Sequence, residues 1–123
     1  MKPKILIVDD SALTRRNLRQ ILESAGCDVL EADDGLAALE RYSLDRPQVV
    51  FLDLVMRGMY GLEVLQKIRE LEPAARIVVV SADIQTSSHD LAAAAGATAF
   101  INKPFDRVEI LAALDTALTG VER

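Results

Sequence analysis

The chain has a single cysteine, no long apolar run and no block of basic residues. Cys27 alone cannot form an intramolecular disulfide or a metal site built from several thiolates, and we expect it to pack as a small buried hydrophobe. No stretch has the length of a membrane span, and the apolar run before the first acids is too short for a signal peptide. We therefore expect no membrane contact and a location in the reducing cytoplasm.

The formal net charge is −5, which argues against nucleic acid as a direct partner. Arg15, Arg16 and Arg19 form a small basic cluster on a predicted helix, and we interpret them as a solvent-exposed face. The 123 residues are half hydrophobic and contain no linker or low-complexity tract. This size and composition predict one globular domain over residues 1–123.

Five short apolar runs alternate with segments of helical periodicity. The runs are apolar on both faces, as are strands of a parallel sheet that is covered on each side. The predicted strands are KILIVD (4–9), CDVLEA (27–32), QVVFLDL (48–54), RIVVVSA (76–82) and TAFINK (98–103). A strand followed by a helix, five times over, predicts an α/β domain with right-handed crossovers and helices on both faces of the sheet.

The segments between the strands carry helix signals. Gly26 is placed to end the first helix and Asp34 to cap the second. Serines and a final glycine bound the fourth, SSHDLAAAAG (87–96), while Asp106 and Glu109 have capping-box spacing in the fifth, 105–118. The predicted inward-facing residues of the first three helices are Leu18, Ile21, Leu22, Ala25, Ala38, Leu39, Tyr42, Leu62, Leu65 and Ile68.

Polar residues follow four of the predicted strands, at the edge where open parallel sheets gather their functional groups. The polar residues are Asp9, Asp10, Asp53, Ser81, Asp83 and Lys103, and Ala82 and Pro104 adjoin them at the ends of the fourth and fifth strands. Each alone has an ordinary explanation, since an acid pair before a helix is often a cap and an acid after a strand is often a turn residue. Because all of these residues follow strands at the same edge of the predicted sheet, we expect their side chains to lie together in one site.

Three carboxylates brought together repel one another and raise one another's pKa unless a cation joins them. An oxygen-only cluster with few ligands suits Mg²⁺. With Lys103 as a second positive charge and Ser81 as a donor, the group makes a receptacle for a phosphoryl group. Asp53 is the candidate nucleophile, because it stands alone on the central strand and faces the metal that the other two acids would hold.

The chain resembles the receiver domain of two-component response regulators. The resemblance covers essentially all 123 residues. It rests on ILIVDDS (5–11), EADDGLAAL (31–39), DLVMRGMYGLEVL (53–65), VVVSA (78–82) and GATAFINKPF (96–105). It implies a flavodoxin-like, doubly wound five-stranded parallel sheet in the order 2-1-3-4-5 with five helices, and a signalling phosphoprotein rather than a turnover enzyme.

The resemblance also implies a role for each site residue. Asp53 would accept a phosphoryl group from the phosphohistidine of a sensor histidine kinase or a phosphotransfer protein. Asp10, Asp53 and the backbone carbonyl of Val55 would ligate Mg²⁺, and Asp9 would act mainly through metal-bound water. Lys103 would pair with Asp53 at rest and with the phosphoryl oxygens afterwards.

The remaining implied roles concern the switch. Ser81 and the Ala82 backbone N–H would bind the phosphoryl group, and Phe100 would turn inward when Ser81 moves toward it. The face formed by the helix at 87–96, the strand at 98–103 and the helix at 105–118 would then change its protein partner. The peptide bond before Pro104 would be cis. Self-catalysed dephosphorylation and a monomer or a phosphorylation-dependent dimer are also expected.

Several positions depart from the family pattern or modify it. Arg57 stands where the family usually has proline, and we interpret it as a solvated loop residue, with contact to a partner or to the edge of the site as the alternative. Phe100 often appears as tyrosine, so its switch would be purely steric. Val55 and Asp83 occupy positions that tune phosphoryl lifetime in the family. His89, the single histidine, is predicted to be an unpaired surface residue without a catalytic role.

Two other functions are compatible with the same residues. One is a Mg²⁺-dependent phosphohydrolase with an aspartyl-phosphate intermediate, which would need an acid two residues after Asp53, where Val55 stands. The other is a phosphate-independent interaction module of the same fold. The segment SADIQTS (81–87) resembles receivers that work beside chemotaxis-type phosphatases, so a phosphatase is among the expected partners. The cognate kinase and the target cannot be read from the sequence.

Overall fold

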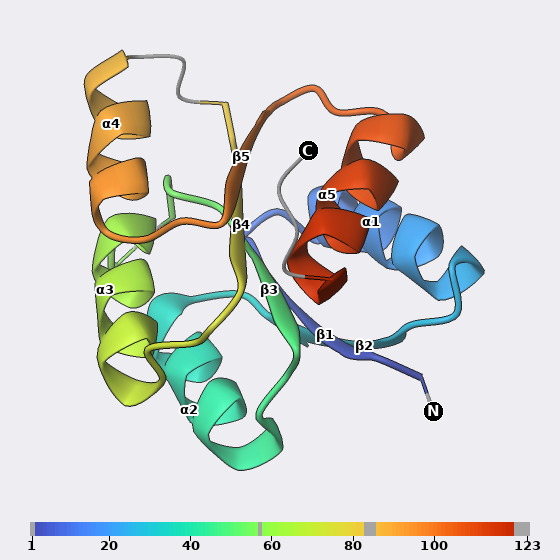
Figure 1. Cartoon of the computed structure of the whole chain (residues 1–123), viewed down its shortest axis with the longest axis horizontal. Coiled ribbons are helices and arrows are strands. Elements are labelled where there is room, and N and C mark those ends of the chain that lie inside the picture. Colours follow the sequence, from blue (N-terminus) through green and yellow to red (C-terminus); the bar gives the residue numbers. More distant parts are fainter. Residues whose placement is uncertain (1, 57, 83–85, 120–123) are drawn as a thin grey trace.

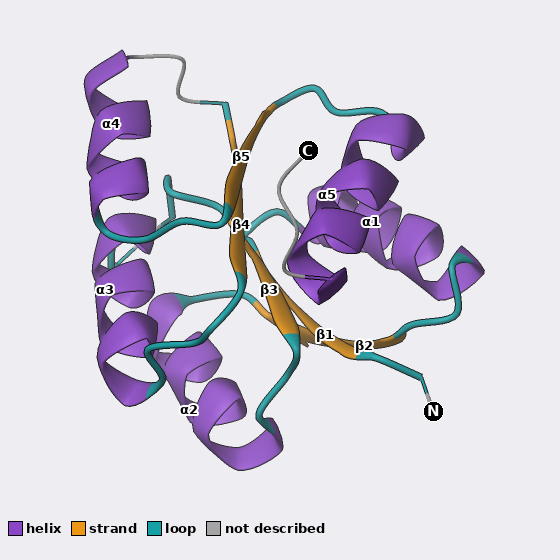
Figure 2. Cartoon of the chain, viewed as in Figure 1, coloured by secondary structure: helices purple, strands orange, loops and turns teal. Residues whose placement is uncertain are grey.

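The chain folds into a five-stranded parallel sheet flanked by helices on both faces (Figures 1 and 2). The computed structural model describes residues 2–56, 58–82 and 86–119. The strands are β1 (Lys4–Val8), β2 (Asp28–Ala32), β3 (Val49–Leu52), β4 (Ile77–Ser81) and β5 (Ala99–Asn102). The helices are α1 (Ala12–Ser24), α2 (Gly35–Asp45), α3 (Gly61–Leu71), α4 (Thr86–Ala94) and α5 (Arg107–Thr119). The strand order β2-β1-β3-β4-β5 confirms the predicted flavodoxin-like α/β fold.

Alternate residues of the strands feed two separate cores. Leu6, Val8 and Leu52 pack toward α2, α3 and α4, whereas Ile7 and Phe51 pack toward α1 and α5. Because the sheet is covered on both faces, its inner strands are apolar except for Lys4 at the start of β1 and Ser81 at the end of β4. Burial of each large side chain contributes roughly 1.5–3 kcal/mol, so the two cores hold the central strand, and the acid that follows it, rigidly.

The helix ends follow the predicted signals in most places. The Asp34 carboxylate accepts a hydrogen bond from the Ala37 N–H at 2.8 Å. Asp106 and Glu109 form the predicted reciprocal pair, with N···O distances of 2.8 and 3.3 Å. Gly26 follows α1 with φ +89°, a left-handed conformation that glycine adopts at little cost.

Three of the sequence predictions are wrong in detail. Ala25 lies just beyond the end of α1 and is exposed, so it does not face the core. Ser87 and Ser88 lie within the first turn of α4, which begins at Thr86, rather than before its first residue. Arg15 and Arg19 are half-buried and paired with Glu31 of β2, while Arg16 alone has the exposed position expected for the cluster.

Cys27 is buried and free, as predicted. Of the described helices, none is both long enough and apolar enough to cross a membrane.

Candidate functional site

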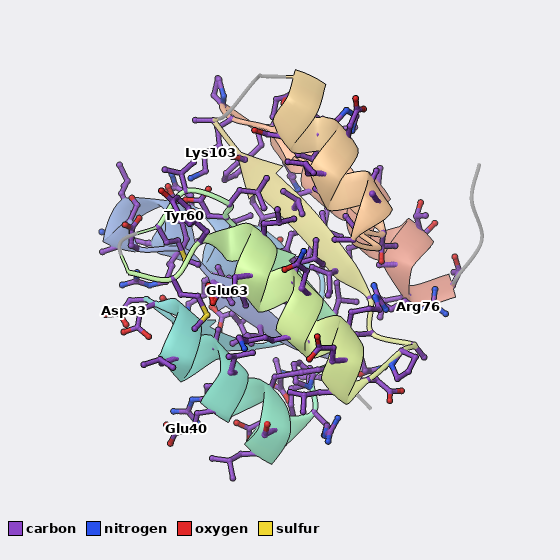
Figure 3. The ribbon with its side chains drawn as sticks, turned by 90° about the vertical axis from the view of Figure 1, so that its left-hand side faces the viewer. Asp33, Glu40, Tyr60, Glu63, Arg76 and Lys103 are labelled. Atoms are coloured by element: carbon purple, nitrogen blue, oxygen red, sulfur yellow. The ribbon has the colours of Figure 1, made fainter. Side chains whose placement is uncertain are left out.

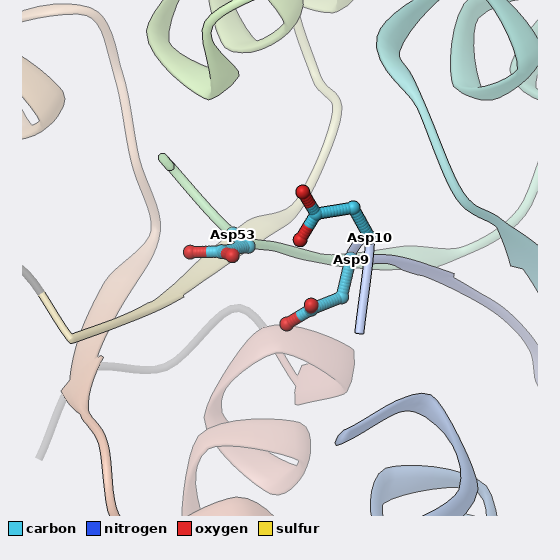
Figure 4. A group of neighbouring side chains, drawn as sticks. All are labelled: Asp9, Asp10 and Asp53. Atoms are coloured by element: carbon cyan, nitrogen blue, oxygen red, sulfur yellow. The ribbon is translucent and has the colours of Figure 1, made fainter. Parts of the chain in front are cut away.

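Three carboxylates meet at the carboxyl edge of the sheet (Figure 4). Asp9 and Asp10 follow β1 and Asp53 follows β3, and one ligand oxygen from each lies within 4.8 Å of the others. The Asp53 N–H donates to the Val8 carbonyl at 2.9 Å, so the ladder between β1 and β3 continues up to the acids. Asp9 and Asp53 are 2% and 5% exposed, whereas Asp10 is half-exposed. The cluster therefore has a rigid buried floor and one side open to water.

Local turns orient two of the carboxylates. Asp9 Oδ1 accepts a hydrogen bond from the Ser11 N–H at 2.8 Å, and Ser11 Oγ in turn caps α1 by accepting from the Thr14 N–H. Asp53 Oδ1 accepts from the Val55 N–H at 3.2 Å. Each acid thus uses one oxygen to fix its own loop and keeps the other for the site.

Lys103 is the cation of the site. Its Nζ lies 2.8 Å from Asp9 Oδ2 and 3.4 Å from Asp53 Oδ2. The predicted pairing with Asp53 is present, but Asp9 is the nearer partner. The Lys103 N–H donates to the Ser81 carbonyl at 2.9 Å, and the following bond to Pro104 is cis, as the resemblance implies.

The carboxyl edge of the sheet lies on one side of the molecule. In Figure 3, Lys103 and Tyr60, which directly precedes α3, lie toward one end, and Arg76, which precedes β4, lies toward the other. The residues that follow the strands are therefore collected at a single end, away from the loops that enter the strands.

The electrostatics reflect crowding of negative charge. Burial raises the pKa of the Asp53 carboxyl, and the neighbouring Asp9 charge raises it further, while Lys103 and the Val55 N–H act in the opposite direction. Burial alone would lower the pKa of Lys103, but its hydrogen bond to Asp9 and the charges of Asp53 and Asp9 raise it overall. One ammonium group faces three acids, so the cluster still favours a further cation.

The donor set fits Mg²⁺. All three side chains offer carboxylate oxygens, the ligands preferred by hard divalent cations, and the half-exposed position of Asp10 leaves room for the waters that Mg²⁺ keeps. Thiol and imidazole ligands, which would favour softer metals, are not part of the group.

The predicted phosphoryl-binding and switch residues lie on the neighbouring strands. Ser81 is fully buried at the end of β4, and Ala82 beyond it is exposed. Phe100 is half-buried on β5, opposite Val79 of β4, and packs against the core beneath α4. Val55 is 57% exposed, next to the acid cluster. Arg57 and Asp83 lie outside the described residues.

His89 has a partner that the sequence did not reveal. Its ring lies 4.5 Å from the ring of Phe100, centroid to centroid, in an edge-to-face arrangement with an interplanar angle of 64°. The prediction of an unpaired surface residue is therefore wrong in respect of pairing, although the side chain is exposed. The contact depends on how α4 is rotated over β5, which residue spacing within either element does not encode.

Comparison with known proteins agrees with this geometry. The family model described as the response regulator receiver domain matches residues 5–115. The chain is 38% identical over 116 residues to the chemotaxis protein CheY of Thermotoga maritima, covering 94% of this chain and 97% of that protein. It is 39% identical over 119 residues to the chemotaxis protein CheY of Bacillus subtilis, covering 96% and 99%.

Solved structures show the same fold. The CheY-like receiver domain protein from Methanospirillum hungatei superposes with a TM-score of 0.94 at 27% identity, covering 98% of this chain and 96% of that one. The chemotaxis protein CheY4 of Vibrio cholerae has a TM-score of 0.91 at 29% identity, covering 96% and 100%.

Proposed function

Because the chain belongs to the response regulator receiver domain family of two-component signalling, we propose that it is a switch that accepts a phosphoryl group on Asp53. The donor is the phosphohistidine of a sensor histidine kinase or of a phosphotransfer protein. The observation that carries the proposal is the buried carboxylate of Asp53 beside Asp9 at the edge of the sheet, with the Lys103 ammonium in contact with both acids. Receiver domains are signalling domains, so the product is a modified protein rather than a released metabolite.

The chemistry follows from the positions of these side chains. An Asp53 carboxylate oxygen attacks phosphorus as the P–N bond to the donor histidine breaks, so an acyl phosphate forms and the imidazole leaves. Lys103, whose raised pKa keeps it charged, is placed to move from Asp53 to the incoming phosphoryl oxygens. Ser81 and the Ala82 N–H donate to the same oxygens from the end of β4.

Asp10, Asp53 and the Val55 carbonyl would hold Mg²⁺ directly, and Asp9 would hold it through water. When bound, the metal neutralises the charge that develops on the phosphoryl oxygens. The rigid strand ends keep Asp53 in line with the donor, which removes much of the orientational cost of the transfer.

The output is a change of protein contact. Ser81 and Phe100 occupy adjacent strands, so a movement of the Ser81 hydroxyl toward phosphate opens space for the Phe100 ring and alters the α4–β5–α5 face. The partner on that face is a downstream protein, and a phosphatase and a phosphorylation-dependent dimer belong to the same proposal. So do the cytoplasmic location, the single domain over residues 1–123 and self-catalysed loss of the phosphoryl group.

Intact-mass measurement after incubation with Mg²⁺ and acetyl phosphate tests the proposal. Wild type should gain one adduct of about 80 Da, the mass of a phosphoryl group. Asp53→Ala should gain none, and Asp90→Ala, which removes an exposed acid on α4, should behave as wild type. An adduct in Asp53→Ala equal to that in wild type would refute Asp53 as acceptor. If no protein gains an adduct and beryllofluoride does not bind, an interaction module independent of phosphate replaces the proposal.

A further inference from the structure

Arg15 on α1 forms hydrogen bonds both to the backbone at the acid cluster and to Glu31 of β2, although it is not one of the three carboxylates that could bind a metal. Its Nη1 donates to the backbone carbonyl of Asp9 at 2.5 Å, and its Nε donates to Glu31 Oε1 at 2.9 Å. We propose that Arg15 is a positioning residue for the metal-binding acids, because it fixes the peptide that connects Asp9 to Asp10. The role of Arg15 in Mg²⁺ binding rests on the proposed function, whereas its role in fixing the peptide between Asp9 and Asp10 rests on the hydrogen bonds alone.

The peptide geometry gives the reason. The Asp9 N–H donates to the Ala32 carbonyl at 3.2 Å, so Asp9 is held on its amide side by β2. Arg15 holds the carbonyl on the other side. Because the peptide unit is planar, fixing this carbonyl also fixes the plane that leads into the Cα of Asp10. The direction of the half-exposed Asp10 carboxylate thus depends on a bond from α1.

Glu31 fixes Arg15 in turn. Its two carboxylate oxygens are divided between two arginines, with Arg15 Nε at 2.9 Å and Arg19 Nε at 2.6 Å. Burial alone would raise the pKa of Glu31, but the hydrogen bonds from Arg19 and Arg15 lower it overall, so the glutamate stays ionised at neutral pH. Planar guanidinium groups keep this geometry better than a flexible ammonium does.

The network adds no net charge to the site. Arg19 also pairs with Glu23 at 3.1 Å, so two arginines are balanced by two glutamates. Arg15 therefore supplies a directional hydrogen bond to the Asp9 carbonyl without cancelling the negative field that attracts Mg²⁺.

Arg19 provides a matched control. It lies one helical turn after Arg15 and shares Glu31, but its remaining backbone bond goes to the Val29 carbonyl in the middle of β2, at 3.2 Å. Arg15→Gln and Arg19→Gln each remove one cation and one bond to Glu31. Only the first removes the bond to Asp9.

The first experiment uses metal-free protein and amide hydrogen exchange by NMR. In Arg15→Gln, the amides of Asp9 and Ser11 should exchange roughly ten-fold faster than in wild type, the effect of one lost hydrogen bond of about 1.4 kcal/mol. In Arg19→Gln these two amides should be unchanged. Unchanged exchange at both amides in Arg15→Gln would overturn the inference.

The second experiment measures the Mg²⁺ affinity of wild type and the two arginine variants by calorimetry. Whether Arg15→Gln binds Mg²⁺ more weakly or more tightly than wild type decides between positioning and charge. Removal of a positive charge near the acids would by itself strengthen binding of a dication. Loss of positioning should weaken it, by about 10–100-fold, as for other residues that orient metal ligands. Arg19→Gln should stay within about two-fold of wild type, a margin set by screening of its more distant charge.

Arg15→Lys separates charge from geometry and guards against a variant that fails to fold. A lysine keeps the charge but cannot donate to Glu31 and to the Asp9 carbonyl in one fixed plane, so Mg²⁺ affinity should remain weakened. Full recovery of affinity in Arg15→Lys, or tighter binding in Arg15→Gln, would overturn the inference. If wild type binds neither Mg²⁺ nor a phosphoryl group, the proposed function fails, and the metal-free exchange data still decide whether Arg15 holds the turn.

Discussion

At the scale of single residues, the ionised carboxylate of Asp53 destabilises the metal-free folded state. Its carboxyl is 5% exposed, and burial and the Asp9 charge raise its pKa above the ordinary value. The folded state then binds more protons than the unfolded state between the two pKa values. The free energy of unfolding therefore falls as pH rises through that window, and the ionised acid destabilises the metal-free fold above it.

We predict that Asp53→Asn makes the metal-free protein more stable at pH 7, by roughly 1 kcal/mol, the scale of a typical single substitution. The difference from wild type should shrink as pH falls through the raised pKa of Asp53 toward the unfolded-state value of about 3.9. Urea unfolding in EDTA across this pH range measures it. Asp90→Asn, on the exposed face of α4, is the control. A less stable Asp53→Asn at pH 7 would contradict the prediction.

Lys103, unlike Asp53, stabilises the metal-free folded state in its charged form. Its folded-state pKa is raised, so its stabilising effect is fully present below the unfolded-state pKa and is lost as pH rises through the folded value. We predict that Lys103→Met, which leaves Asp9 and Asp53 without their counter-charge, lowers the free energy of unfolding by about 2 kcal/mol in EDTA at pH 7.

The matched variant is Lys67→Met, which removes an exposed lysine from α3 and should change stability by no more than about 0.5 kcal/mol. Thermal unfolding of both variants gives the comparison. Equal effects of the two substitutions would mean that the contacts of Lys103 with the two acids do not stabilise the fold.

At the scale of elements, α3 begins directly against the end of β3. The Gly61 N–H donates to the Leu54 carbonyl at 2.9 Å, which ties the first residue of the helix to the loop that follows β3. A Cβ at Gly61 would lie 2.1 Å from the Asp53 carbonyl oxygen and 2.5 Å from Leu54 Cα. Since both neighbours are backbone atoms, no side-chain rotation can relieve the overlap.

Gly61→Ala should therefore displace either α3 or the Asp53 loop. We predict a loss of about 2–3 kcal/mol in the free energy of unfolding and slower phosphorylation by acetyl phosphate. Gly26→Ala is the control, because Gly26 has φ +89° but no atom within 4 Å of an added Cβ. It should lose about 1 kcal/mol from backbone strain and keep the wild-type phosphorylation rate. Similar phosphorylation rates in the two variants would contradict the prediction.

Elements also mark the limit of what the sequence predicts. The strands and the edge where Asp9, Asp10 and Asp53 meet follow from apolar runs and parallel topology, which bring strand ends together whatever the side-chain details. The strand order is implied only by the resemblance to receiver domains. The bonds of Arg15 and the contact of His89 with Phe100 depend on the rotation of a helix against a strand. Periodicity shows which helical face is apolar, but not which polar residue at the edge of that face reaches a neighbouring strand.

At the scale of the whole molecule, cation binding should couple to folding. The acids come from the ends of β1 and β3 and are brought together only in the folded chain, so a cation that binds them stabilises the folded state alone. We predict that Mg²⁺ at 100 times its Kd adds about 2.7 kcal/mol to the free energy of unfolding.

Thermal unfolding with increasing MgCl₂, beside NaCl at equal ionic strength, measures this effect. Asp10→Asn should show a much smaller Mg²⁺-dependent rise in Tm, because one of the two carboxylates that would bind Mg²⁺ directly is lost. The same rise with NaCl as with MgCl₂ would mean that general screening, rather than a specific site, produces the stabilisation.

The contact between Lys103 and Asp9 joins residues that are 94 positions apart in the sequence and that directly follow β5 and β1, two strands separated by β3 and β4. It forms only after both halves of the sheet have assembled. Under the proposed function, the ability to accept a phosphoryl group is therefore a check on complete folding. An incompletely folded copy would not be phosphorylated and would therefore not activate the downstream partner. Errors in folding would then cause loss of output rather than output without a signal.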